Sequence, residues 1–156
     1  MSDKGVCILH TIGSILPPQP NAPFIQRYIF PDGEIPHESD MAKNIEKSGL
    51  IMSDRETLIR HYDKTLEAWL NRFLKNKHIV KDLFDQKFVK MWEFYLASCS
   101  AAFKYRDLVV FQYQLVKNFD AIPSNRRDYI YSWRVSAINK IVCLLYTSDA
   151  ADEQLS

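Results

Sequence analysis

The chain has 156 residues, of which 47% are hydrophobic and 25% charged, a composition typical of one globular domain and not of a disordered chain. Twenty Lys and Arg against nineteen Asp and Glu leave a net charge of +1, so no long-range field favours nucleic acid as a partner. Three cysteines without Cys-x-x-Cys spacing indicate no disulfide framework, and they fit a cytoplasmic location. No segment approaches the roughly 20 apolar residues of a transmembrane helix, so we expect only peripheral membrane contact.

The first expected element is a strand at Val6–Leu9, an uninterrupted apolar run typical of a strand buried on both faces of a parallel sheet. Such a strand needs neighbours, and only five residues precede it. We therefore expect the natural sequence to continue upstream of Met1.

The other end of the chain predicts a boundary. Residues 1–131 are assigned to the domain, and residues 132–156 to a non-native tail, because the sequence from about Cys143 resembles translated read-through of a sequencing adapter. The origin of 132–142 stays open, with a natural C-terminal segment as the alternative.

Between these ends the pattern begins as strand, loop, helix and strand. Four prolines make Ile15–Pro23 an extended loop, and Phe24–Pro36 is predicted to be a second loop, anchored by aromatic side chains around a turn at Pro31. Ser39 is expected to cap a helix that Gly49 stops, and a strand follows from Leu50.

Two amphipathic helices are expected next, at Tyr62–Lys75 and from an Asp85 cap onward, packed against each other. After them, Leu108–Val116 alternates aromatic and aliphatic residues with glutamines, which predicts a half-exposed antiparallel strand near the sheet's edge. The expected apolar stripes are Leu66, Trp69, Leu70 and Phe73 on the first helix, and Phe88, Trp92, Tyr95, Cys99 and Phe103 on the second.

Four blocks match one enzyme family in order and spacing: Leu9–Ser14, Phe24–Pro36, His61–Phe73 and Met91–Leu96, the last followed by Ala101–Asp107. Together they resemble the C-terminal part of the cyclopropane-fatty-acyl-phospholipid synthases, which are S-adenosylmethionine-dependent methyltransferases. The resemblance implies an α/β fold: the C-terminal portion of a class I, Rossmann-like methyltransferase sheet with a helical insertion before its last strand. That insertion would help to cover the lipid acyl-chain channel.

Members of this family transfer a methyl group to a cis double bond of a phospholipid acyl chain, and loss of a proton closes a cyclopropane ring. A bound bicarbonate is the base in this scheme. By resemblance, His10 and Tyr62 are the catalytic residues that hold bicarbonate, and Ile12 contributes its backbone. His10 follows Leu9 and is expected at the carboxyl end of its strand, where ligands of open α/β sheets bind. The family's cysteine, glutamate and cofactor-binding loop would lie upstream of Met1, so the chain alone is expected to be inactive.

Structural interpretations stand beside these roles. His10 and Tyr62 could be ordinary boundary residues whose polar atoms meet solvent. His37, His61 and His78 are expected at the surface, and no residue is assigned to a metal.

The resemblance implies phospholipid acyl chains at the inner membrane face as partners, with room for a homodimer of the complete protein. Two other functions remain open. One is an acyl-chain methyltransferase that leaves a methyl or methylene branch, and the other is a non-catalytic lipid-binding or interaction module.

Overall fold

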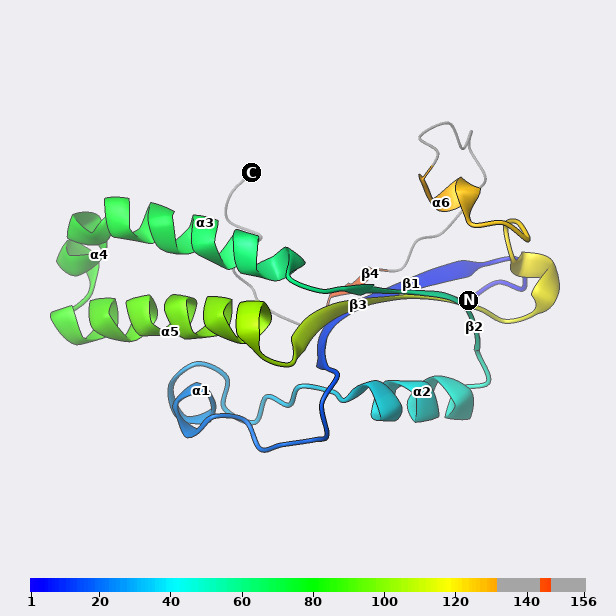
Figure 1. Cartoon of the computed structure of the whole chain (residues 1–156), viewed down its shortest axis with the longest axis horizontal. Helices are drawn as coiled ribbons and strands as arrows, with labels where there is room; N and C mark the ends of the chain where they lie inside the picture. The colour runs from blue at the N-terminus through cyan, green and yellow to red at the C-terminus, as the bar shows by residue number, and fades with distance from the viewer. Residues whose placement is uncertain (132–143, 147–156) are drawn as a thin grey trace. The chain divides into compact units, whose positions relative to one another are not determined.

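The computed structural model describes residues 1–131 and 144–146, which divide into two compact units (Figure 1). The first, here called the sheet unit, contains Met1–Ile12, Glu38–Thr57 and the chain from Phe111 onward. The second, the helical unit, contains Gly13–His37 and Leu58–Val110. Among the described residues, no helix is both long and apolar enough to cross a bilayer.

Four strands form one sheet in the order β2-β3-β1-β4. β3 runs antiparallel to β1, because Gln112 lies beside His10 while Asn118, farther along, bonds to Asp3 near the start of the chain. β4 pairs with β1 in parallel. The bounds are Val6–Ser14 for β1, Ile51–Leu58 for β2, Leu108–Val116 for β3 and Leu144–Tyr146 for β4. The strands expected at Val6 and Leu50 are therefore confirmed but run farther than the apolar residues alone predicted.

The prediction that β3 is half-exposed is wrong, whereas its antiparallel direction and its place near the sheet's edge, next to the edge strand β2, are confirmed. Seven of its nine residues are buried, and it lies between β2 and β1. The alternation was interpreted as glutamines facing water, but the amides of Gln112 and Gln114 both bond to protein groups. A polar side chain whose hydrogen bonds are made by its neighbours can be buried without a large cost.

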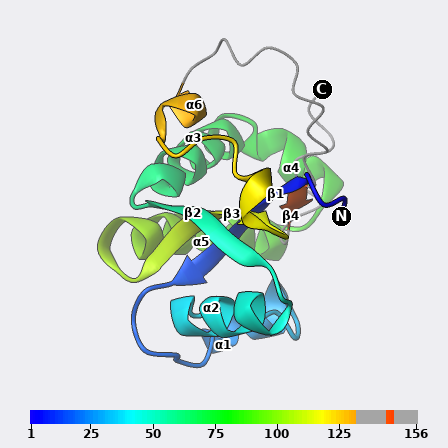
Figure 2. The ribbon, with the colours of Figure 1, turned by 90° about the vertical axis from the view of Figure 1, so that its right-hand side faces the viewer.

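The core of the sheet unit lies where the start of β1 packs against the end of β3. Val6 at the start of β1 packs with Val116 at the end of β3 and with Ala121 in the short 3-10 helix η1, Phe119–Ala121. Figure 1 and Figure 2 both place α2, Glu38–Lys47, and α6, Asp128–Tyr131, on opposite sides of these strands. Both faces of the strands are thus covered within this unit.

Helix α2 begins two residues earlier than the predicted Ser39 cap implied. Glu38 is its first residue, so Ser39 lies inside the helix and is not its N-cap. Glu38 and Asp40 place negative charge in the first turn, where the helix dipole favours it. The predicted stop is confirmed: Gly49 has φ of 72°, and its N–H donates to the Glu46 carbonyl at 3.0 Å.

The helical unit is built on α3, His61–Lys75, and α5, Gln86–Tyr105, which lie side by side as predicted (Figure 1). Leu66 of α3 is 1% exposed, and Leu96 of α5 is 2% exposed. The predicted aromatic stripe of α5 is only partly right, since Tyr95 and Phe103 are buried but Val89 and Leu96 complete the buried face. The two helices stand between β2 and β3 in the chain, which confirms the helical insertion before the last strand of the domain.

Two short helices were missed. α1, Pro23–Tyr28, lies in a segment predicted to be a loop, and its proline stands in the first turn, where the missing N–H costs nothing. α4, Lys77–Leu83, joins α3 to α5 and buries no residue. The turn expected in the loop after α1 is confirmed, because the Gly33 N–H donates to the Phe30 carbonyl at 3.2 Å.

The predicted tail, 132–156, lies outside the described residues except for the backbone of β4. Its assignment as non-native sequence stays a prediction.

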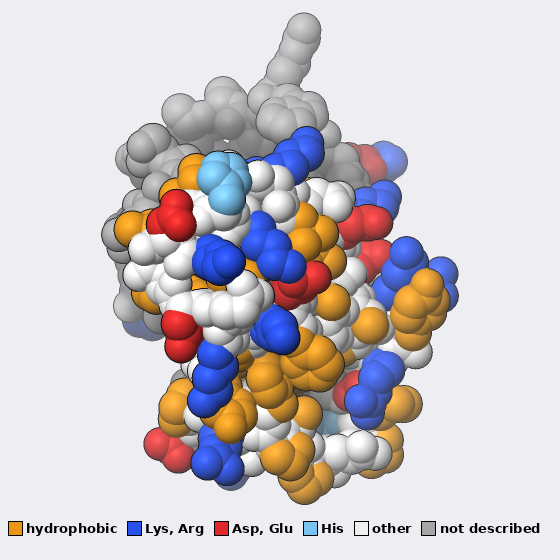
Figure 3. Space-filling model, turned by 90° about the vertical axis from the view of Figure 1, so that its left-hand side faces the viewer, with side chains coloured by type: hydrophobic (Ala, Val, Ile, Leu, Met, Phe, Trp, Pro, Cys, Tyr) orange, Lys and Arg blue, Asp and Glu red, His pale blue; other side chains and the backbone are white. Residues whose placement is uncertain are grey.

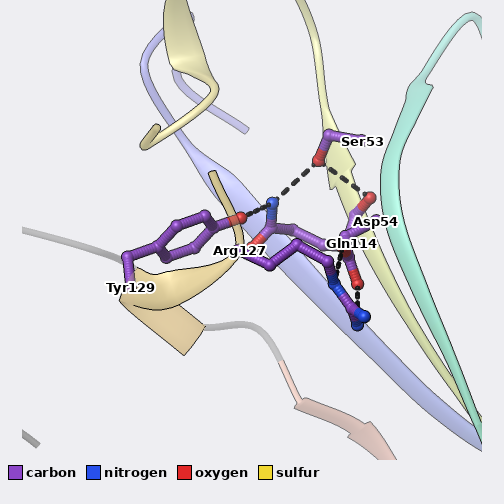
Figure 4. Close-up of polar contacts among 5 residues, drawn as sticks. All are labelled: Ser53, Asp54, Gln114, Arg127 and Tyr129. Atoms are coloured by element: carbon purple, nitrogen blue, oxygen red, sulfur yellow. Dashed lines mark hydrogen bonds and ion pairs between the residues drawn. The ribbon is translucent and has the colours of Figure 1, made fainter. Parts of the chain in front are cut away.

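A polar cluster ties α6 and the segment before it to β2 and β3 (Figure 4). The Gln114 amide donates to Ser53 Oγ at 2.9 Å and to the Tyr129 hydroxyl at 2.6 Å. Arg127 forms a two-point ion pair with Asp54, with Nε at 2.7 Å from one carboxylate oxygen and a terminal nitrogen at 3.0 Å from the other. Both contacts join the C-terminal end of the described domain to the strands.

Replacing Tyr129 by phenylalanine tests whether this polar cluster, here called the clamp, stabilises the sheet unit. Gln114 is only 7% exposed, so a lost partner leaves a buried amide N–H unsatisfied at a cost of about 1–2 kcal/mol. Urea unfolding followed by circular dichroism measures the loss, and Tyr105→Phe, at a side chain 75% exposed, is the matched control. Equal stability of both variants and the wild type would show that the clamp contributes nothing.

Helix α5 begins at the predicted cap, where an Asp85 carboxylate oxygen accepts from the Phe88 N–H at 2.7 Å. Asp85→Ala should therefore lower the free energy of unfolding by about 1 kcal/mol. Asp82→Ala is the control, because Asp82 is exposed in the last turn of α4, where a negative charge is unfavourable. Thermal unfolding of the two variants should separate them, and a larger loss for Asp82→Ala would contradict the capping role.

Candidate functional site

His10 is the fifth residue of β1 and lies in the middle of the strand. The expectation that it stands at the strand's carboxyl end is wrong, because β1 continues through Ser14. Pairing with β3 carries the strand beyond its apolar run, since backbone hydrogen bonds do not require apolar side chains.

A hydrogen bond to β3 orients the imidazole of His10. The Gln112 amide nitrogen lies 3.1 Å from His10 Nδ1. Burial lowers the pKa of His10 below its usual value of 6.5, so the neutral ring is favoured near pH 7. With Gln112 donating to Nδ1, the ring's proton is on Nε2. His10 thereby becomes a neutral donor of one hydrogen bond.

Ile12 lies two residues after His10 on β1 and therefore on the same face of the strand. Between them Thr11 is 6% exposed, and its hydroxyl donates to the Ile12 carbonyl at 2.9 Å. The sheet unit thus brings two of the three predicted site residues onto one face of one strand.

Tyr62 is the second residue of α3, the helical unit's first long helix, and is half-buried. Its ring lies 5.9 Å from that of Trp69 and 5.0 Å from that of Phe103, so aromatic neighbours on α3 and α5 hold it. Tyr62 belongs to the other unit from His10, and the grouping of the two residues remains a prediction.

Sequence reasoning missed two residues at these positions. Gln112 was interpreted as facing solvent, and no sequence signal separates a glutamine that meets a histidine from one that meets water. Asp63, next to Tyr62, is 7% exposed, and among the described residues its Oδ1 has no hydrogen-bond partner. The helix dipole favours a carboxylate in the first turn of a helix. The position of Asp63 in the sequence therefore indicated the start of a helix, but it did not indicate that the side chain is buried.

The motif blocks meet one another inside the helical unit. Ser14, which closes the first block, donates from Oγ to an Asp107 carboxylate oxygen at 2.6 Å. The Ile15 N–H donates to the Asp107 carbonyl at 3.2 Å. The second block meets the fourth, because the Phe24 ring lies edge-on to the Phe94 ring at 4.8 Å. Residues far apart in the sequence therefore form one packed assembly.

Three comparisons bear on this arrangement. The family model described as mycolic acid cyclopropane synthetase matches residues 1–113. A cyclopropane-fatty-acyl-phospholipid synthase of Escherichia coli K12 is 35% identical over 112 residues, which are 72% of this chain and 29% of the relative. A probable fatty acid methyltransferase of Pseudomonas putida is 41% identical over 81 residues, which are 52% of this chain and 21% of the relative.

A solved structure shows the same fold. Mycolic acid cyclopropane synthase CmaA1 in complex with SAH and CTAB superposes with a TM-score of 0.64 at 26% identity, over 71% of this chain and 44% of that protein. The chain spans less than a third of the length of the two curated relatives. It carries the C-terminal portion of the class I methyltransferase fold.

The state of His10 can be measured by nuclear magnetic resonance. The ring should titrate below pH 6.5 with its proton on Nε2, because burial disfavours the charged form. Since the folded pKa is depressed, the stability that His10 contributes is complete above pH 6.5 and is lost as the pH falls through the folded pKa. Gln112→Glu should raise that pKa and move the proton to Nδ1, because a carboxylate accepts from the ring.

Nitrogen-15 chemical shifts of the imidazole report the tautomer, and His10→Gln identifies the resonance. Gln112→Met, which removes the donor without adding charge, is the matched control. A ring that titrates above pH 6.5 in the wild type would contradict the effect of burial.

Proposed function

We propose, from the premise that the chain belongs to the mycolic acid cyclopropane synthetase family, that it is part of a methyltransferase that forms cyclopropane rings on phospholipid acyl chains. The observation that carries the proposal is the family match over residues 1–113, which includes His10, Ile12 and Tyr62. The proposed substrate follows the name of the Escherichia coli relative.

The proposed reaction needs a methyl donor. S-adenosylmethionine supplies an electrophilic methyl group on a sulfonium, and the bound SAH and lipid-like CTAB of the related CmaA1 structure support this assignment. The chain's four glycines, Gly5, Gly13, Gly33 and Gly49, are too widely spaced to form a glycine-rich loop for this cofactor. We assign no residue of this chain to it.

The net reaction adds one CH₂ across a cis double bond and releases one proton, so the site needs a base in a water-poor pocket. Bicarbonate, when bound, would supply that base. We propose that His10, Tyr62 and the Ile12 backbone hold it. His10 fits an oxyanion, because its neutral ring with a proton on Nε2 donates a hydrogen bond to the anion. It adds no positive charge, which would lower the basicity of the bound bicarbonate.

Tyr62 fits the same role from the helical unit. A phenolic hydroxyl donates to an anion, and the rings of Trp69 and Phe103 restrict the orientation of the Tyr62 ring. An aromatic setting also excludes water, which strengthens hydrogen bonds to a small anion. Gln112 acts as a positioning residue through His10.

The substrate's place is also part of the proposal. We place the acyl chain at the inner face of the membrane, with peripheral contact of the protein, and a homodimer of the complete protein stays a prediction. A second candidate product is a methyl or methylene branch, which the fatty acid methyltransferase from Pseudomonas putida favours by its name. All of these products share the methyl transfer and differ in the fate of the resulting cation: the ring and the methylene branch each form by loss of a proton, whereas a saturated methyl branch needs a hydride from a separate donor.

Lipid mass spectrometry of cells that express the complete reading frame containing this chain should decide the product. A ring and a methylene branch both add one CH₂ and have the same mass, so mild hydrogenation before the measurement separates them, because only the methylene takes up two hydrogens. A saturated methyl branch carries two additional hydrogens from the start. Ring-containing acyl chains support the proposal. A branched product in their place would contradict it and support the second candidate.

In the same protein, His10→Gln and Tyr62→Phe should each lower kcat by about 100-fold or more, because each removes a donor to the bound anion. Calorimetry should show S-adenosylmethionine affinity close to that of the wild type, since neither residue is assigned to the cofactor. Tyr105→Phe, at a side chain 75% exposed, is the control. Unchanged turnover in both variants would remove His10 and Tyr62 from the base-holding site.

A further inference from the structure

The turn of the helical hairpin carries an unusual concentration of exposed apolar side chains. Fifteen large hydrophobic residues are exposed in the described part of the chain, and four of them lie within 74–84. We call the segment 72–90 the hairpin tip. Its exposed apolar residues are Leu74 at 41%, Ile79 at 48%, Leu83 at 73% and Phe84 at 53%.

Helix α4 is the reason for this exposure. It has seven residues and buries none of them, so no core holds its apolar side chains. Ile79 and Leu83 are four residues apart and lie on one face of the helix. Phe84 follows directly and stacks on Phe88 with ring centroids 4.3 Å apart. These side chains form a continuous apolar edge that continues through Phe88 to Trp92 at 5.8 Å.

Positive charge surrounds the same edge. The hairpin tip contains six basic residues and two acidic ones, a net charge of +4, whereas the whole chain has +1. Lys77 is paired with Glu93 at 2.5 Å, and the other five basic residues are exposed. Figure 3 looks onto this end of the molecule and shows Lys and Arg side chains grouped across it, with hydrophobic side chains among and below them. The exposed basic residues are Arg72, Lys75, Lys81, Lys87 and Lys90.

We propose that the hairpin tip is the docking surface for an anionic phospholipid bilayer. Exposed Leu83 and Phe84 would enter the boundary between headgroups and acyl chains, and the long lysine stems would keep their ammonium groups at the lipid phosphates. Each basic residue near an anionic membrane surface adds to the attraction. The inference rests on the proposed function, because it supplies the contact through which the enzyme would reach phospholipid acyl chains.

A protein partner fits this surface less well. Lysine is depleted in protein interfaces, and four of the five exposed basic residues of the tip are lysines. A bilayer tolerates mobile lysines, because its headgroups move with them and no fixed geometry is required.

Cosedimentation of the 156-residue chain with vesicles tests the docking surface. One vesicle preparation contains phosphatidylglycerol and phosphatidylcholine in equal parts, and the other contains phosphatidylcholine alone. We expect binding to the anionic vesicles that weakens as salt is raised. The double variant Lys81→Gln with Lys87→Gln should weaken binding by about tenfold or more. The double variant Leu83→Ser with Phe84→Ser should weaken binding at low salt and at high salt alike.

The matched controls are Lys64→Gln, at an exposed lysine in the first turns of α3, and Phe119→Ser, at a side chain 75% exposed in η1. Both should bind like the wild type. Circular dichroism checks that all variants are folded, and Lys81→Gln with Lys87→Gln changes only exposed side chains. Equal binding of the tip variants and the controls, or no binding to anionic vesicles, overturns the proposal. If the chain binds a small acidic protein through the tip but does not bind vesicles, the proposal is also overturned, and the tip is assigned to a protein partner.

The measurement needs neither cofactor nor turnover, so its failure is separable from a failure of the proposed function. Docking through the tip with no methylated lipid in cells would leave the docking surface and overturn the enzymatic proposal. Ring formation by a protein whose tip variants bind vesicles normally would do the reverse.

Discussion

The burial of β3 is the constraint on which the sheet unit depends. A strand whose side chains are largely buried must give its polar side chains partners within the protein, and β3 carries two glutamines on the same face. Gln112 meets this requirement with His10 of β1, and Gln114 meets it with Ser53 of β2 and Tyr129 of α6. The same two side chains therefore orient the candidate site and fasten the helix that follows the sheet.

The chemistry of His10 follows from that constraint. An exposed histidine would exchange its ring proton between both nitrogens and carry a charge over part of the physiological pH range. Partial burial lowers its pKa and Gln112 selects one tautomer, so the ring presents a defined donor. An anion that must take up a proton is better held by such a neutral donor than by a cation, which would lower the basicity of the anion.

The helical unit combines two roles in one hairpin. At its base, the Tyr62 ring packs against those of Trp69 and Phe103. At its far turn, α4 has no buried residue and leaves apolar and basic side chains in water. A helix pair needs a core along most of its length but not at its turn. The side chains of the turn can therefore serve as the proposed docking surface for a lipid bilayer.

The sequence by itself determined the order of β1 to β3 and of the long helices between them, the α3 and α5 pairing, the Asp85 cap, the Gly49 stop and the family. These features depend on local periodicity and on residue types in a row. It also indicated His10, Ile12 and Tyr62, but only through resemblance. The tertiary structure decided what alternation could not: that Gln112 and Gln114 are satisfied inside the sheet, that His10 is in mid-strand, and that Asp63 is buried. Local pattern reports which side chains are apolar, whereas the burial of a polar side chain depends on a partner supplied from elsewhere in the chain.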